Sequence, residues 1–99
     1  MYILINESGN LSLQDHDSMK GFSIVDRTMG ENRSELEAIS QPAEDDHYWI
    51  DAQAVIDLSP GSTDKQWVEQ FWKMLEGAAP YGYANMETGQ VKAHVEKSE

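Results

Sequence analysis

The sequence predicts a single α+β domain, built on a small, mostly antiparallel sheet of about five to six strands with one amphipathic helix packed on one face. Three observations indicate this class. Short apolar runs flanked by turn residues occur near both ends, a long alternating stretch occupies the middle, and a helical stripe of aromatic residues follows it. The 99 residues fit one domain, residues 1–99, because chains of this size usually close around a single core.

The first strands are predicted at the N-terminus. Tyr2 to Ile5 is a compact β-prone run, and Leu11 to Leu13 alternates apolar and polar residues. The turn-forming residues between them favour a hairpin. Residues 19–29 fit both a helical stripe and a strand, and we expect a strand near 21–27.

Residues 29–46 are poor in apolar side chains. A short helix is predicted over Ser34 to Ser40, where Ser34 is a suitable cap and Pro42 would end the element. Polar segments of this length in small domains are usually either functional or mobile, and both interpretations stay open.

The clearest strand pattern covers residues 48–58. Every even position from Tyr48 to Leu58 is apolar, and Trp49 and Val55 share the odd positions with polar residues. We expect one long strand that ends at a turn over residues 59–62.

A helix is predicted over residues 63–77. Thr63 and Gln66 have the spacing of a capping box, and Gly77 is placed to end the helix in a left-handed conformation. Its aromatic and aliphatic residues share one side and are expected to be core rather than pocket: Trp67, Val68, Phe71, Trp72 and Leu75. A C-terminal hairpin of 81–86 and 91–96 completes the sheet, with His94 on its exposed face.

The net charge of −11 arises mainly in the first half of the chain. Twelve acids and three bases lie between Glu7 and Asp57. This balance argues against direct binding to nucleic acid or to anionic membranes and favours a basic protein surface as partner, with solubility alone as the competing interpretation. Without cysteine, signal-peptide pattern or membrane-spanning run, the chain is expected to be cytoplasmic and free of disulfides.

Two acid–histidine clusters, residues 15–17 and 44–47, are the only candidates for a metal site. Neither has the spacing of an established metal motif, so His16 and His47 are weak candidates and we expect no metal and no cofactor. The chain also has no nucleophile elbow and no glycine-rich phosphate loop. The sequence therefore favours a protein that is not an enzyme.

The segment around the second cluster is the candidate interaction site. An exposed tryptophan beside acids has the chemistry of an interface anchor, although Trp49 also suits burial beneath a polar loop. We expect the partner-binding residues to be Glu44, Asp45, Asp46, Trp49 and Asp51.

The function hypothesis is a small acidic protein–protein interaction module, of the inhibitor or immunity type, that occupies a basic, nucleic-acid-binding surface of its target. It rests on size and charge alone. One alternative is a small α+β enzyme or ligand-binding domain with a pocket between helix and sheet, using His16, His47, Asp45 and Asp46 as polar groups. A second alternative is an accessory subunit of a larger complex, held by a sheet edge.

Overall fold

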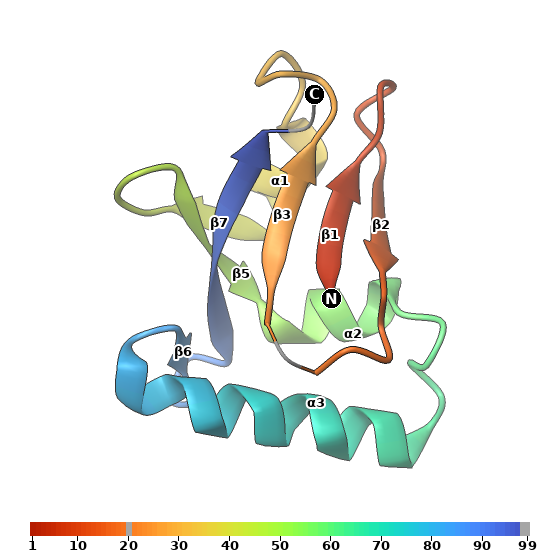
Figure 1. The fold of residues 1–99 in the computed structure, drawn as a ribbon, viewed down its shortest axis with the longest axis vertical. Coiled ribbons are helices and arrows are strands. Elements are labelled where there is room, and N and C mark those ends of the chain that lie inside the picture. The colour runs from red at the N-terminus through yellow and green to blue at the C-terminus, as the bar shows by residue number, and fades with distance from the viewer. Residues whose placement is uncertain (20, 98–99) are drawn as a thin grey trace.

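The computed structural model describes residues 1–19 and 21–97, and these form a mixed sheet of seven strands with three α-helices (Figure 1). The strands are β1 (Tyr2–Ile5), β2 (Leu11–Gln14), β3 (Ser23–Asp26), β4 (Ser40–Pro42), β5 (His47–Asp51), β6 (Ala84–Asn85) and β7 (Gln90–Lys97). The helices are α1 (Ser34–Ala38), α2 (Ala52–Leu58) and α3 (Lys65–Ala78), and the 3-10 turn η1 (Ala79–Tyr81) follows α3. The α+β class is therefore confirmed. None of these helices is long and apolar enough to cross a bilayer.

The sheet is larger and less antiparallel than expected. Its order is β2-β1-β3-β7-β5-β4, and β6 pairs with the start of β7. The β1–β3 and β3–β7 pairs are parallel, whereas the remaining pairs are antiparallel. Parallel neighbours need long connections, and here β3 and β7 are joined through all the intervening helices and strands. Local sequence patterns identify strands but not partners so far apart along the chain.

The N-terminal hairpin, the strand within 21–27 and the C-terminal hairpin are confirmed as β1–β2, β3 and β6–β7. Helix α1 forms where a short helix was predicted, but the capping prediction was wrong. Arg33 is its N-cap residue and makes no side-chain cap bond, while the hydroxyl of Ser34 donates to Oδ1 of Asn32 at 2.9 Å.

The long strand predicted over 48–58 is wrong beyond Asp51. The chain leaves β5 there and enters α2, because the side chain of Asp51 accepts a hydrogen bond from the amide of Gln53 at 3.2 Å and caps the helix. Ala52, Val55 and Ile56 are buried, which is the three- and four-residue spacing of a helical face. Because Ala52 and Ala54 lie at even positions, the sequence continues the apolar alternation of β5 into this segment.

Helix α3 differs from its prediction at both ends. Asp64, not Thr63, is the N-cap residue, and its carboxylate accepts from the amides of Gln66 and Trp67 at 3.0 and 3.5 Å. Gly77 lies inside the helix, and the left-handed residue is Gly82, with φ of 85° after η1. Figure 1 shows α3 crossing the strands at the end where β1, β3 and β7 begin.

The core lies between one face of the sheet and the helices. Trp67, Phe71 and Leu75 of α3 are buried in it, so they are core as expected, while Val68 and Trp72 are partly buried and pack against it. The strand residues that point to this core are fully or nearly fully buried: Ile3, Ile5, Ile24, Ile50, Val91, Ala93 and Val95. Alternate strand residues point the other way. They form a half-buried to exposed surface, the open sheet face: Tyr2, Leu4, Ser23, Val25, His47, Trp49, Lys92, His94 and Glu96.

Candidate functional site

The acidic segment predicted as an interaction site forms the tip of the β4–β5 hairpin. The amide of His47 donates to the carbonyl of Glu44 at 3.0 Å, which closes a turn around Asp45 and Asp46. Both aspartates have positive φ, 52° and 59°. Tight hairpin turns require this conformation, and aspartate tolerates it better than most residues because its short side chain hydrogen-bonds locally. The three acids are therefore presented at a bend rather than along a strand.

Two of these three acids have partners within the chain. Lys92 pairs with Glu44, and Nη1 of Arg33 lies 2.9 Å from Oδ1 of Asp46. The hydrogen bond from Lys92 lowers the pKa of Glu44 below its ordinary value. Asp45 is exposed at the tip of the turn. The negative charge available to a partner is thus smaller here than the sequence suggests.

Trp49 and Asp51, the other predicted interaction residues, also have internal contacts. Trp49 is half-buried on the open sheet face, and Nζ of Lys92 lies 5.8 Å from its ring centroid in a cation–π arrangement. Asp51 caps α2. The role of the five residues in partner binding stays a prediction, but four of them also organise the fold.

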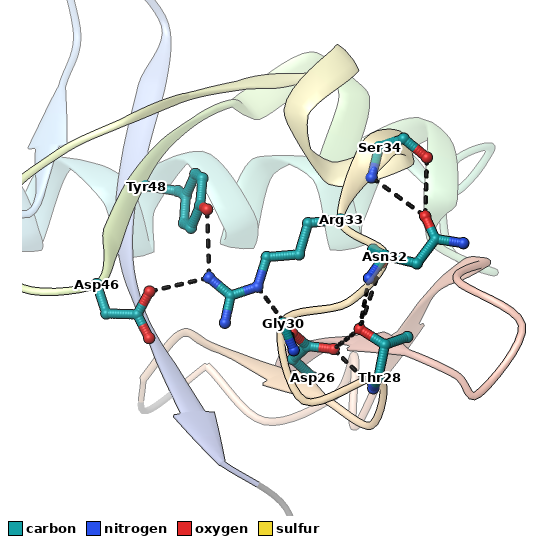
Figure 2. Close-up of polar contacts among 8 residues, drawn as sticks. All are labelled: Asp26, Thr28, Gly30, Asn32, Arg33, Ser34, Asp46 and Tyr48. Carbon is teal, nitrogen blue, oxygen red and sulfur yellow. Dashed lines mark hydrogen bonds and ion pairs between the residues drawn. The ribbon is translucent and has the colours of Figure 1, made fainter.

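The most connected polar site of the described chain is the Arg33 network, formed by Asp26, Thr28, Gly30, Arg33, Asp46 and Tyr48 (Figure 2). Asp26 ends β3 and is only 2% exposed. Its carboxylate accepts from the amide and hydroxyl of Thr28 at 2.8 and 2.6 Å, and from the amide of Gly30 at 2.9 Å. Nε of Arg33 donates to the same carboxylate at 2.7 Å.

Arg33 connects this buried carboxylate to the acidic turn. Its Nη1 donates to Asp46 at 2.9 Å and to the hydroxyl of Tyr48 at 3.3 Å. Figure 2 shows the guanidinium lying between Asp26 on one side and Asp46 and Tyr48 on the other. A planar guanidinium donates in several directions at once, which a lysine cannot do. The network therefore fixes the loop after β3, the start of α1 and the turn before β5 relative to one another.

The fold stabilises the charged forms of Asp26 and Arg33. Burial raises the pKa of Asp26, but hydrogen bonds from Thr28, Arg33 and Gly30 lower it by more, so the pKa lies below its ordinary value. Burial likewise lowers the pKa of Arg33, and its bonds to Tyr48, Asp26 and Asp46 outweigh that effect and raise it. Asp26 and Arg33 therefore form an ion pair that is charged at neutral pH.

Sequence reasoning missed the Arg33 network. A signal was present, since Arg33 is the only base between Arg27 and Lys65 in a strongly acidic stretch. A lone arginine in such surroundings has several possible acid partners, and the pattern does not say which one the fold places beside it.

The two acid–histidine clusters do not meet. His16 lies beside Asp17, with Nε2 3.4 Å from its carboxylate, and its backbone carbonyl accepts from the indole of Trp67 at 2.7 Å. His47 instead lies against His94 of β7, with ring centroids 4.9 Å apart. Among residues 1–19 and 21–97, no three histidine, aspartate or glutamate side chains converge as metal ligands.

A groove of about 700 Å³ lies where the alternative hypothesis expected a pocket, between α3 and the sheet. Its lining is mainly apolar: Met19, Phe22, Met74, Leu75, Tyr81 and Val91. Among the described residues, its charged lining residues are Lys73 and Lys92, and none of His16, His47, Asp45 and Asp46 lines it. The groove therefore lacks the acid–base groups proposed for an enzyme.

Fold and site together define a small acidic α+β domain with a mixed sheet, an internal Arg33 network and an open sheet face. No protein-family model, curated protein or solved structure matches the chain.

Proposed function

We propose that this protein is a non-enzymatic, inhibitor- or immunity-type interaction module whose acidic lobe occupies a basic, nucleic-acid-binding surface of a target protein. The acidic lobe is residues 31–57, which fold as α1, β4, β5 and α2. This part of the chain carries eight acids and one base, a net charge of −7 out of −11. Residues 65–97, which contain α3, β6 and β7, carry four acids and four bases and are neutral.

This charge partition is the observation that carries the proposal. Charge that serves solubility alone needs no concentration in one segment of the chain, whereas concentrated charge orients a molecule as it approaches a basic surface. The lobe's single base, Arg33, is held between Asp26 and Asp46, so it does not neutralise the lobe's other acids. All eight acids of the lobe are exposed; Glu44 and Asp46 are paired within the chain, and the other six are Glu31, Glu35, Glu37, Asp45, Asp51 and Asp57.

The lobe also borders an apolar hollow. A depression of about 400 Å³ is lined by five apolar residues and two acids: Leu11, Ala38, Ile39, Ala54 and Leu58, with Glu35 and Asp57. Apolar contacts surrounded by charges are typical of specific protein interfaces. A basic partner with one apolar side chain at its centre would match both features of this surface.

The experiment compares two charge-reversal variants with the same change in net charge. The test variant is Glu31→Lys, Glu37→Lys and Asp57→Lys on the acidic lobe, and the control is Glu69→Lys, Glu76→Lys and Glu87→Lys on the neutral part. All six side chains are exposed, so both variants should fold, which circular dichroism would verify.

Each immobilised protein is exposed to nuclease-treated cell extract, and the retained proteins are identified. We expect the wild type and the control to retain a common basic protein that double-stranded DNA displaces, and the test variant to lose it. Retention should also fall steeply with salt. Equal retention by both variants, or equal loss in both, would contradict a role for the acidic lobe.

The groove beside α3 favours a second candidate function, binding of an apolar ligand. Tyr81 is 79% exposed and Tyr83 51% exposed at this groove, and large exposed aromatic side chains are typical of binding surfaces. A Tyr81→Ala variant leaves the acidic lobe intact. If Tyr81→Ala abolished retention of the basic protein and the acidic-lobe variant did not, the groove rather than the acidic lobe would be the binding site.

A further inference from the structure

The facing histidines of β5 and β7 occupy a position suited to sharing a ligand. His47 and His94 are register partners on the open sheet face. The neighbouring pair along the two strands is Asp46 and Val95. It is hydrogen-bonded, because the amide of Val95 donates to the carbonyl of Asp46 at 2.9 Å. His47 and His94 therefore form a non-hydrogen-bonded pair, in which the side chains of an antiparallel ladder approach most closely.

The tautomer of the neutral His47 ring is set by its surroundings. Nδ1 of His47 lies 2.9 Å from the carbonyl oxygen of Glu44 and 3.0 Å from that of Asp45. Carbonyl oxygens only accept hydrogen bonds, so Nδ1 carries the proton and Nε2 of the neutral ring keeps its lone pair. Metal-ligating histidines commonly donate their other ring nitrogen to a backbone carbonyl in this way. The turn at Asp45 and Asp46 thus also orients His47.

The separation of the rings fits chelation. An imidazole nitrogen binds Zn²⁺ at about 2.0–2.1 Å, which places two adjacent rings on one ion with centroids about 4.5–5.3 Å apart. The centroids of His47 and His94 are 4.9 Å apart, with planes inclined at 55°. The separation of the two rings therefore matches that of two imidazoles bound to one ion.

We propose that His47 and His94 form a two-imidazole site for a divalent transition-metal ion, Zn²⁺, Ni²⁺ or Cu²⁺. Imidazole suits these ions, whereas Mg²⁺ and Ca²⁺ prefer oxygen ligands. No third histidine or carboxylate converges among the described residues, so water completes the coordination. Lys92, the neighbouring base on this face, is paired with Glu44, which reduces its repulsion of a cation. This site is independent of the proposed function.

The test is calorimetric titration of the chelator-treated full chain with Ni²⁺, in buffer containing excess Mg²⁺ to occupy surface carboxylates. We expect one ion per chain. His94→Ala is the cleaner variant, because His94 is exposed and its replacement leaves the turn intact. It should weaken binding at least about tenfold, since the second imidazole binds intramolecularly in the wild type. His47→Gln should do the same, and His16→Ala is the matched histidine control.

A second measurement keeps the proposal testable if the His47 variant is poorly folded. In the wild type, added Zn²⁺ should shift the imidazole NMR signals of His47 and His94 and leave those of His16 unchanged. Three results would overturn the proposal: unchanged affinity in His94→Ala, an equal loss in His16→Ala, or a stoichiometry of one ion to two chains.

Discussion

Asp26 shows how one residue determines the conformation of a long polar segment. Residues 27–33 contain little that can be buried, so their order depends on hydrogen bonds rather than on apolar contact. The carboxylate of Asp26 supplies these bonds, because it accepts from Thr28, Gly30 and Arg33 at the end of β3. Removing one member of a buried ion pair leaves the other without compensation. The network is therefore the most sensitive polar site in the described chain.

We predict that Asp26→Asn lowers the free energy of unfolding by about 3 kcal/mol at neutral pH. Because the folded pKa of Asp26 is lowered, its stabilising contribution is complete above the unfolded pKa of about 3.9 and is lost as pH falls through the folded value. The wild type should thus lose more stability on acidification than the variant. Urea denaturation from neutral pH to about pH 3 measures both effects.

Tyr48→Phe is the matched control within the same network. It removes only the 3.3 Å hydrogen bond to Arg33 and keeps the buried ring, so it should lower the free energy of unfolding by no more than about 1 kcal/mol. Parallel pH profiles for the wild type and Asp26→Asn would show that Asp26 is not the group responsible.

At the residue scale, the sequence predicted the exposed acids but not their partners. The exposure of Asp45 follows from its place in a polar loop. The Arg33–Asp26 pair joins the start of α1 to the end of β3 across a loop whose path no periodic pattern defines. His47 meets His94 only because β5 pairs with β7 in one register. Such pairings depend on the sheet, which local patterns do not determine.

At the scale of elements, predictions succeeded where the stabilising contacts are local. The β1–β2 hairpin has its turn between its own strands, and α3 has a strong apolar stripe. The three-residue strand β4 was not predicted, because Ser40, Gln41 and Pro42 have no apolar pattern and form a strand only by pairing with β5. The prediction for the α2 segment was wrong because the apolar pattern of its sequence fits both the strand period and the helix period over so few residues.

The start of α3 depends on close packing between Gly61 and Trp67. A Cβ atom at Gly61 would lie 2.8 Å from Cγ and 3.0 Å from Cδ2 of this indole. Trp67 is buried, stacks on Phe71 at 5.3 Å and donates to the carbonyl of His16. The indole has little freedom to move away, so glycine is required here for space rather than for backbone conformation.

We predict that Gly61→Ala destabilises the protein by about 1–3 kcal/mol, as expected for overpacking at a buried ring. Gly77→Ala is the control, because nothing lies within 4 Å of a Cβ at this helical position. It should stabilise the protein by up to about 1 kcal/mol. Thermal unfolding followed by tryptophan fluorescence measures both variants, and equal stability of Gly61→Ala and the wild type would contradict the packing argument.

For the whole molecule, the dominant feature is the uneven charge. The acidic lobe carries −7 over residues 31–57, and its carboxylates repel one another in the folded state. Dissolved ions screen this repulsion over distances of about 10 Å at moderate ionic strength. The folded state should accordingly gain stability from salt, in contrast to a protein held together by surface ion pairs.

We predict that the melting temperature rises as NaCl increases from low concentration to about 0.5 M. Removing three of the lobe's negative charges with Glu31→Gln, Glu37→Gln and Asp57→Asn should raise the melting temperature at low salt and flatten the salt response. The control substitutions on the neutral part should change the melting temperature and its salt response less: Glu69→Gln, Glu76→Gln and Glu87→Gln. A melting temperature that falls with salt would show that attractive pairs outweigh the repulsion.

The place of β7 in the sheet has a consequence for the order of folding. Within the described residues, β7 alone joins the β2-β1-β3 group to the β5-β4 pair, yet it follows both along the chain. As a chain emerges from the ribosome N-terminus first, β3 and β5 would each expose an unpaired edge until β7 inserts between them. Sheet completion is therefore a late, long-range event, during which the nascent protein depends on its charge to avoid pairing with other chains.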